Sequence, residues 1–134
     1  MAEGYSKFRS LWTEAPVEIP SAILASLGRW RGRLRALGLV GALENGVGFG
    51  NISARLGSGF IITGSATGGL EHLEPRHYCL VQETRAEENW LACRGLVRAS
   101  SESLSHAAVY GALPAAGAVI HVHSAALWRR FLGR

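Results

Sequence analysis

Glycine is the residue that most constrains how this chain folds, because its seventeen copies divide the sequence into short segments. Two glycine-rich stretches, at 45–50 and 64–69, are typical of turns. A third cluster, Gly57-Ser58-Gly59, separates two short apolar runs and predicts a hairpin turn. No apolar run approaches the roughly 20 residues that a membrane span needs. The 134 residues are therefore expected to form one domain built of short elements.

The apolar periodicity between these turns predicts an α/β fold. A helix is predicted from Ser21, its N-cap, to about Gly38 or Gly41, a second from Ser100 or Ser101 to about residue 112, and a third from near Ser124. The predicted strands lie at 51–56, 60–63, 78–82, 90–94 and 118–123. This order of elements indicates a layered domain in which helices flank a central, mainly antiparallel sheet.

The domain is expected to occupy residues 21–134, after an N-terminal arm at 1–20. Residues 1–18 are predicted to be loosely structured or partly helical. The first residues have no apolar secretory core, and Cys79 and Cys93 are interpreted as reduced thiols. We therefore expect a cytoplasmic protein with no membrane partner.

The charged residues exclude several kinds of chemistry. All ten acidic residues are Glu, and thirteen of the fourteen basic residues are Arg, with Lys7 as the single lysine. A Ser-His-Asp triad, an EF-hand and a P-loop lysine are therefore ruled out. An imine-forming lysine in the interior is excluded as well. Any reaction must use Glu, His, Ser, Thr, Arg or a metal.

The net charge of +4 raises the question of nucleic-acid binding. The densest cluster is Arg29, Arg31, Arg33 and Arg35. On a helix these residues form two i,i+4 pairs on different sides, whereas a DNA-reading face gathers its charge on one side. We therefore expect a solvated helix face and no nucleic-acid partner.

The sequence His121-Val122-His123 is the sharpest candidate for chemistry. Side chains at i and i+2 of a strand project from the same face, so the two imidazoles are close enough to share one metal ion. Zn²⁺, or another divalent metal that accepts imidazole, suits such a pair. The alternative is two polar residues on the open face of an edge strand, and the pair alone does not decide between them.

A second candidate is Ser100-Ser101-Glu102, which is either an ordinary helix start or an oxyanion-binding helix N-terminus with Glu102 as acid/base. The two glycine-rich loops are likewise either plain turns or anion cradles made of backbone N–H groups. His106 follows Glu102 by four residues. It either orients Glu102 or is a hydrogen-bonded polar residue on a helix packed against the sheet, and we favour the second.

Four motifs occur in an order and spacing that resemble the class II aldolase/adducin family, which includes the fuculose-phosphate aldolases. The resemblance runs from about residue 22 to the end of the chain. The motifs are Gly50-Asn51-Ile52-Ser53-Ala54-Arg55, Ile61-Ile62-Thr63-Gly64-Ser65-Ala66-Thr67-Gly68, Ala99-Ser100-Ser101-Glu102 and His121-Val122-His123-Ser124.

The resemblance implies a metal-dependent aldehyde-lyase that acts on a small, phosphorylated sugar or hydroxy-carbonyl compound and assembles as a homo-oligomer, such as a tetramer. It assigns a divalent metal, usually zinc, to His121 and His123, and proton transfer at the enediolate carbon to Glu102. Substrate phosphate binding falls on Asn51, Thr67, Gly68, Ser100 and Ser101. A metal acting as Lewis acid agrees with the lack of an interior lysine.

The chain also departs from the family pattern. The family's third metal-binding histidine lies several strands beyond the histidine pair, whereas this sequence ends eleven residues after His123. We therefore expect a member truncated at its C-terminus. The alternative function is a catalytically silent structural or interaction module, as in the head domain of adducin.

Overall fold

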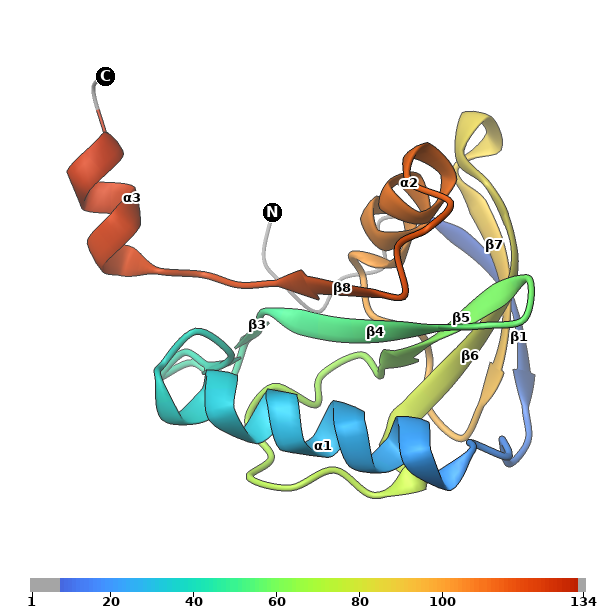
Figure 1. Cartoon of the computed structure of the whole chain (residues 1–134), viewed down its shortest axis with the longest axis horizontal. Helices are drawn as coiled ribbons and strands as arrows, with labels where there is room; N and C mark the ends of the chain where they lie inside the picture. The colour runs from blue at the N-terminus through green and yellow to red at the C-terminus, as the bar shows by residue number, and fades with distance from the viewer. Residues whose placement is uncertain (1–7, 133–134) are drawn as a thin grey trace.

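The computed structural model describes residues 8–132, which form two β-sheets and three α-helices (Figure 1). The helices are α1 (Ser21–Ala36), α2 (Ser103–Ala112) and α3 (Ala125–Phe131). The strands of the large sheet are β1 (Arg9–Glu14), β4 (Asn51–Leu56), β5 (Gly59–Thr63), β6 (Tyr78–Arg85), β7 (Trp90–Gly95) and β8 (Ala118–His121). The small sheet consists of β2 (Gly41–Ala42) and β3 (Gly48–Phe49), and short 3-10 helices lie at Pro75–His77 and Ala86–Glu88.

The large sheet is mainly antiparallel, as predicted. Its strand order is β1-β7-β6-β5-β4-β8. β1 runs parallel to β7, and the four other neighbouring pairs are antiparallel. The predicted fold class, an α/β layered domain with helices flanking this sheet, is confirmed.

The side chains of β5 alternate between the two faces of the sheet, and each face packs against its own helix. Phe60 and Ile62 share a core with Tyr110 of α2. Ile61, between them, packs in a second core with Leu27 of α1. Because successive side chains of a strand point to opposite faces, α1 and α2 cover opposite sides of the sheet, as Figure 1 shows.

The N-terminal segment differs from its prediction. Residues 9–14, expected to be loosely structured or partly helical, form β1 along β7. The backbone N–H of Arg9 donates to the carbonyl of Asn89, and the indole N–H of Trp12 donates to the carbonyl of Gly95 at 3.0 Å. The pairing partners of β1 lie some 80 residues away, so local periodicity gives no sign of them. Residues 1–7 of the predicted arm lie outside the described residues.

Three predicted element ends also shift. Pro20, rather than Ser21, takes the N-cap position of α1. α2 begins at Ser103 instead of Ser100 or Ser101, because residues 100–102 form a turn in which the N–H of Ser103 donates to the carbonyl of Ser100. β8 ends at His121, so His123 lies beyond the strand, and its backbone N–H donates to the carbonyl of Leu39.

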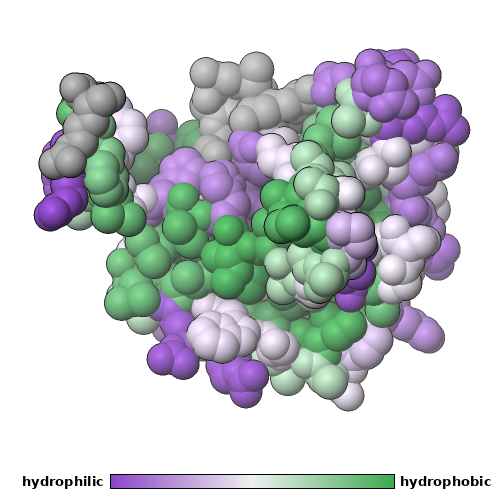
Figure 2. Space-filling view, turned by 45° about the horizontal axis from the view of Figure 1, so that its top comes forward, coloured by the Kyte–Doolittle hydropathy of each residue, from purple (hydrophilic) through white to green (hydrophobic). Residues whose placement is uncertain are grey.

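α3 stands clear of the sheet at the end of an extended segment (Figure 1). Its start agrees with the prediction, since the Ser124 hydroxyl accepts a hydrogen bond from the N–H of Leu127. Leu127 and Trp128 are exposed, and Figure 2 shows the helix separated from an apolar area on the same face. No helix within residues 8–132 is long and apolar enough to span a membrane.

Arg31 is buried, which corrects the prediction of a solvated arginine face on α1. Only 3% of its surface is exposed. Its guanidinium donates to the carbonyl oxygens of Thr67 at 2.9 Å and Leu70 at 2.8 Å, and at 3.4 Å to those of Gly68 and Glu71. Arg31 therefore ties α1 to the second glycine-rich loop.

Substituting Arg31→Met is expected to lower the free energy of unfolding by about 2 kcal/mol or more, because hydrogen bonds from a charged donor to several carbonyls are lost. The loop at 64–71 should also become more susceptible to proteolysis. Urea denaturation and limited proteolysis measure the two effects. Arg29→Met, at an exposed position of the same helix, is the control and should change neither. Equal behaviour of the two variants would contradict the role given to Arg31.

Candidate functional site

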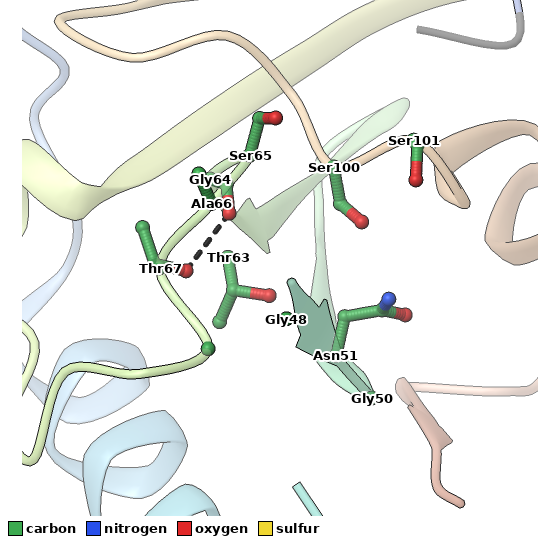
Figure 3. Close-up of a pocket in the computed structure, with 11 residues that line it drawn as sticks. Gly48, Gly50, Asn51, Thr63, Gly64, Ser65, Ala66, Thr67, Ser100 and Ser101 are labelled. Carbon is green, nitrogen blue, oxygen red and sulfur yellow. Dashed lines mark hydrogen bonds between the residues drawn. The ribbon is translucent and has the colours of Figure 1, made fainter. Parts of the chain in front are cut away.

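Three segments that are distant in sequence meet in one small polar pocket (Figure 3). The first is the turn before β4 together with Asn51, the first residue of β4. The others are the loop after β5 and the turn before α2. The cavity volume is about 20 Å³, which is room for a water-sized group, so a phosphate would enter with one oxygen first. The residues that line it are Gly48, Gly50, Asn51, Thr63, Gly64, Ser65, Ala66, Thr67, Gly68, Ser100 and Ser101.

All five residues to which the family resemblance assigned phosphate binding line this pocket. In Figure 3 the hydroxyls of Ser100 and Thr63 point toward the space beside Asn51. The Ser100 hydroxyl accepts from the N–H of Glu102 at 3.3 Å, which leaves its own proton available. The Thr67 hydroxyl instead donates to the carbonyl of Gly64 at 2.8 Å, so in this conformation its proton is already used in a hydrogen bond.

The pocket depends on glycine at two places. A Cβ at Gly68 would lie 2.2 Å from the carbonyl oxygen of Gly41, so no side chain fits there. Gly50 has φ +78°, a left-handed conformation that L side chains rarely adopt, and a Cβ there would lie 2.8 Å from a methyl of Val40. Gly68 therefore allows the loop after β5 to lie close to β2 and β3, and Gly50 allows the turn before β4 to lie close to residues 39–40 and to the end of β8.

A buried chain of hydrogen bonds lies beside the pocket, between the sheet and α2. Nδ1 of His106 lies 2.7 Å from the Ser53 hydroxyl, which lies 2.7 Å from the hydroxyl of Tyr110. Nε2 of His106 is hydrogen-bonded to Oδ1 of Asn51. The interpretation of His106 as a hydrogen-bonded polar residue on a helix packed against the sheet is confirmed.

The surroundings of His106 keep it neutral near neutral pH. Burial is the main cause that lowers its pKa to about 4, and the charge of His121 lowers it further. The Glu102 carboxylate acts in the opposite direction. His121 and Glu102 therefore both lie close enough to His106 to influence its charge.

The pairing of β8 with β4 brings the histidine pair next to the pocket. His121 lies directly opposite Asn51 in the antiparallel ladder, so the two side chains project from the same face of the sheet. The ring centroids of His121 and His123 are 4.9 Å apart, and the His123 ring also packs against Phe49 at 5.6 Å. The expectation that the two imidazoles stand side by side holds although His123 is outside the strand.

The histidine pair fits part of a divalent-metal site. Nδ1 of His121 is buried and has no hydrogen-bond partner among the described residues, which is unusual for a polar atom and suits a nitrogen that could bind a metal ion. Within residues 8–132, however, no group of three or more His, Cys, Asp or Glu side chains is placed to hold a metal. Two imidazoles are present, and further ligands have to come from elsewhere.

Glu102 occupies the N-cap position of α2 and does not line the pocket. Its Oε2 accepts from the Ser105 hydroxyl at 3.4 Å, and it is not part of a metal-ligand group in the described residues. Its predicted role as proton carrier, like the roles of the other site residues, stays a prediction.

Sequence reasoning missed Arg31, Ser53 and Thr63. A signal existed for Arg31, because it follows Leu24 and Leu27 at seven and four residues and so lies on the apolar face of the helix. Ser53 follows Asn51 by two residues on a predicted strand, which places both on one face. Nothing in the sequence shows that α2 reaches either of them.

A comparison with known proteins identifies the family of this chain. Residues 41–128, more than half of the chain, match the family described as "Class II Aldolase and Adducin N-terminal domain". The chain therefore belongs to this family. No curated protein and no solved structure gave a significant match.

Stability is expected to fall as the pH decreases from about 6.5 to about 4, because the unfolded chain then protonates His106 whereas the folded chain does not. The difference between these pKa values corresponds to roughly 3 kcal/mol. Above about pH 6.5 this contribution is fully present. Urea denaturation between pH 4 and 8 measures it, and the His106→Gln variant should lose this part of the pH dependence. Identical profiles for the two proteins would contradict the buried neutral state.

Proposed function

We propose that this chain is a metal-dependent aldehyde-lyase of the class II aldolase type, acting on a small phosphorylated sugar or a similar hydroxy-carbonyl compound. One observation carries the proposal. A pocket lined by glycines and by hydroxyl-bearing side chains lies directly beside two adjacent imidazoles, because Asn51 and His121 are paired across β4 and β8.

The pocket is suited to the phosphate end of such a substrate. Ser100 and Ser101 line it from the turn before α2, and Thr67 and Gly68 line it from the loop after β5, where we propose that backbone N–H groups meet the anion. The loop is already held in place by Arg31, so little conformational entropy is lost when an anion binds.

His121 and His123 would hold the metal, Zn²⁺ or another divalent ion. When bound, such an ion supplies Lewis-acid stabilisation of the negative charge that develops on the substrate oxygens. We propose that the remaining ligands are water, substrate or a residue of a neighbouring copy in a homo-oligomer, such as a tetramer. The exposed apolar side chains of Ile120 on β8 and Trp128 on α3 support such an assembly.

Glu102 is the proposed proton carrier. In the cleavage direction, Glu102 takes the proton of the substrate hydroxyl as the carbon–carbon bond breaks, and an aldehyde leaves while the electron pair stays on the enediolate. Glu102 then delivers a proton to the enediolate carbon, and it removes that proton in the synthetic direction. The buried free thiols of Cys79 and Cys93 support the cytoplasm as the place of action.

The alternative is a catalytically silent structural or interaction module. It is favoured by one observation, the lack of a third metal ligand among residues 8–132. A measurement of metal binding distinguishes the lyase from the silent module.

The purified protein is expected to bind about one Zn²⁺ per chain, and His121→Ala should reduce this to below about a tenth, because a two-imidazole site cannot survive on one. His72→Ala, at an exposed position, is the matched control and should bind zinc as the parent does. Metal analysis combined with light scattering gives zinc content and mass in one sample. A folded protein without zinc would overturn the lyase proposal and leave the silent module.

Glu102→Gln should retain zinc and lower proton exchange into a phosphorylated hydroxy-ketone by at least about 100-fold, since the amide cannot carry the proton. Incorporation of deuterium from D₂O into dihydroxyacetone phosphate, followed by NMR, measures the exchange. Glu44→Gln, exposed on a turn, is the control. Exchange at the parent rate in Glu102→Gln would assign the proton transfer to another group.

A further inference from the structure

The orientation of the Asn51 side chain decides the polarity of one side of the pocket. An asparagine amide has a C=O end that only accepts hydrogen bonds and an NH₂ end that only donates them, and the two ends have nearly the same shape. Asn51 is 4% exposed and lines the pocket, so whichever end faces inward is the end that meets a ligand. An inward oxygen would repel an anion, whereas an inward nitrogen would bind it.

The contact with His106 fixes this orientation. Nε2 of His106 is hydrogen-bonded to Oδ1 of Asn51, in a buried position where water cannot substitute for either group. Because Oδ1 can only accept, Nε2 has to carry the hydrogen. This conclusion is the same for a neutral and for a charged imidazole, so it does not depend on the titration of His106.

The other end of the chain of hydrogen bonds agrees with this assignment. With its hydrogen on Nε2, a neutral imidazole can only accept at Nδ1, so the Ser53 hydroxyl donates to it at 2.7 Å. The Ser53 oxygen can then accept from the Tyr110 hydroxyl, which is also 2.7 Å away. Every donor in this series of hydrogen bonds has an acceptor when His106 carries its hydrogen on Nε2.

We propose that His106 is a positioning residue, which holds the Asn51 amide with its oxygen toward α2 and its nitrogen toward the pocket, so that the pocket accepts oxyanions. The inference deepens the proposed function, since it rests on anion binding at the same site. Nδ2 of Asn51 adds a donor to those of Ser100 and the loop after β5. The oxygen Oδ1, which would repel an anion, instead accepts a hydrogen bond from Nε2 of His106.

Two substitutions of His106 separate positioning from packing. The side-chain nitrogen of glutamine takes approximately the place of Nε2, so His106→Gln keeps a donor for Asn51 and loses the contact with Ser53. Asparagine is shorter and takes approximately the place of Nδ1, so His106→Asn keeps the contact with Ser53 and loses that with Asn51. Inorganic phosphate is the probe, and calorimetric titration gives its Kd.

We expect His106→Gln to bind phosphate within about threefold of the parent, and His106→Asn to bind it at least about tenfold more weakly. Equal loss in both variants would show a packing effect, and unchanged binding in both would show that Asn51 needs no positioning. Either result overturns the proposal.

A measurement on the parent protein tests the proposal even if the His106→Asn variant does not fold. In a ¹⁵N-labelled sample at pH 7, the long-range ¹H–¹⁵N spectrum of His106 should show the Nε2–H tautomer, and the Asn51 NH₂ signals should shift when phosphate is added. A hydrogen on Nδ1 would overturn the inference. If the parent binds no phosphate, the proposed function loses its anion site, whereas the tautomer still decides the orientation of Asn51.

Discussion

The pairing of β8 with β4 is the interaction on which the site depends. It places His121 opposite Asn51, so the histidine pair and the polar pocket lie on one face of the sheet. A shift of the register by one residue would turn the imidazole of His121 toward the α1 face. No tight turn joins these two strands, since more than 60 residues separate them, so the register has to be fixed by packing. α2 contributes to this packing through His106 and Tyr110, which are hydrogen-bonded to Ser53 of β4.

Buried polar contacts, more than apolar ones, hold the parts of the site together. On the α2 side, His106 joins Ser53 and Asn51, and on the α1 side Arg31 holds the loop after β5. Polar groups are costly to bury and repay that cost only when every partner is present. Such contacts favour one arrangement strongly over its neighbours. The apolar cores around Ile61 and Ile62 stabilise the sheet, whereas these contacts determine where the loops lie on it.

Much of the fold could be predicted from local sequence. The hairpin at 57–59, the strand at 51–56 and the start of α3 follow from turn residues, alternation and an N-cap, all of which act over a few residues. The segment 9–14 could not be predicted, because its strand character comes from its pairing with β7 (Trp90–Gly95), which is distant in the sequence. The spacing of Arg31 from Leu24 and Leu27 places it on the apolar face of α1, but its partners could not be predicted, since they are carbonyl groups of a distant loop and carry no side-chain signature.

The site, like the fold, has features that local sequence predicts and features that depend on distant contacts. The motifs predicted which residues gather around the pocket, but not how their atoms are used. Thr67 lines it, yet its hydroxyl is hydrogen-bonded to the carbonyl of Gly64, and His106 acts on the pocket only through Asn51. Hydrogen-bond direction depends on the full set of neighbours, and no pattern in one segment contains that information.

Arg31 has an effect beyond fastening a loop. In a planar trans peptide the C=O and the following N–H point in opposite directions. A guanidinium that draws the carbonyls of Thr67 and Gly68 to itself therefore turns the amide hydrogens of Gly68 and Gly69 away from α1. The positive charge thus aligns a short row of peptide dipoles, whose positive ends extend its field through the loop. A cation that never touches the ligand can in this way raise the electrostatic potential on the far side of the backbone.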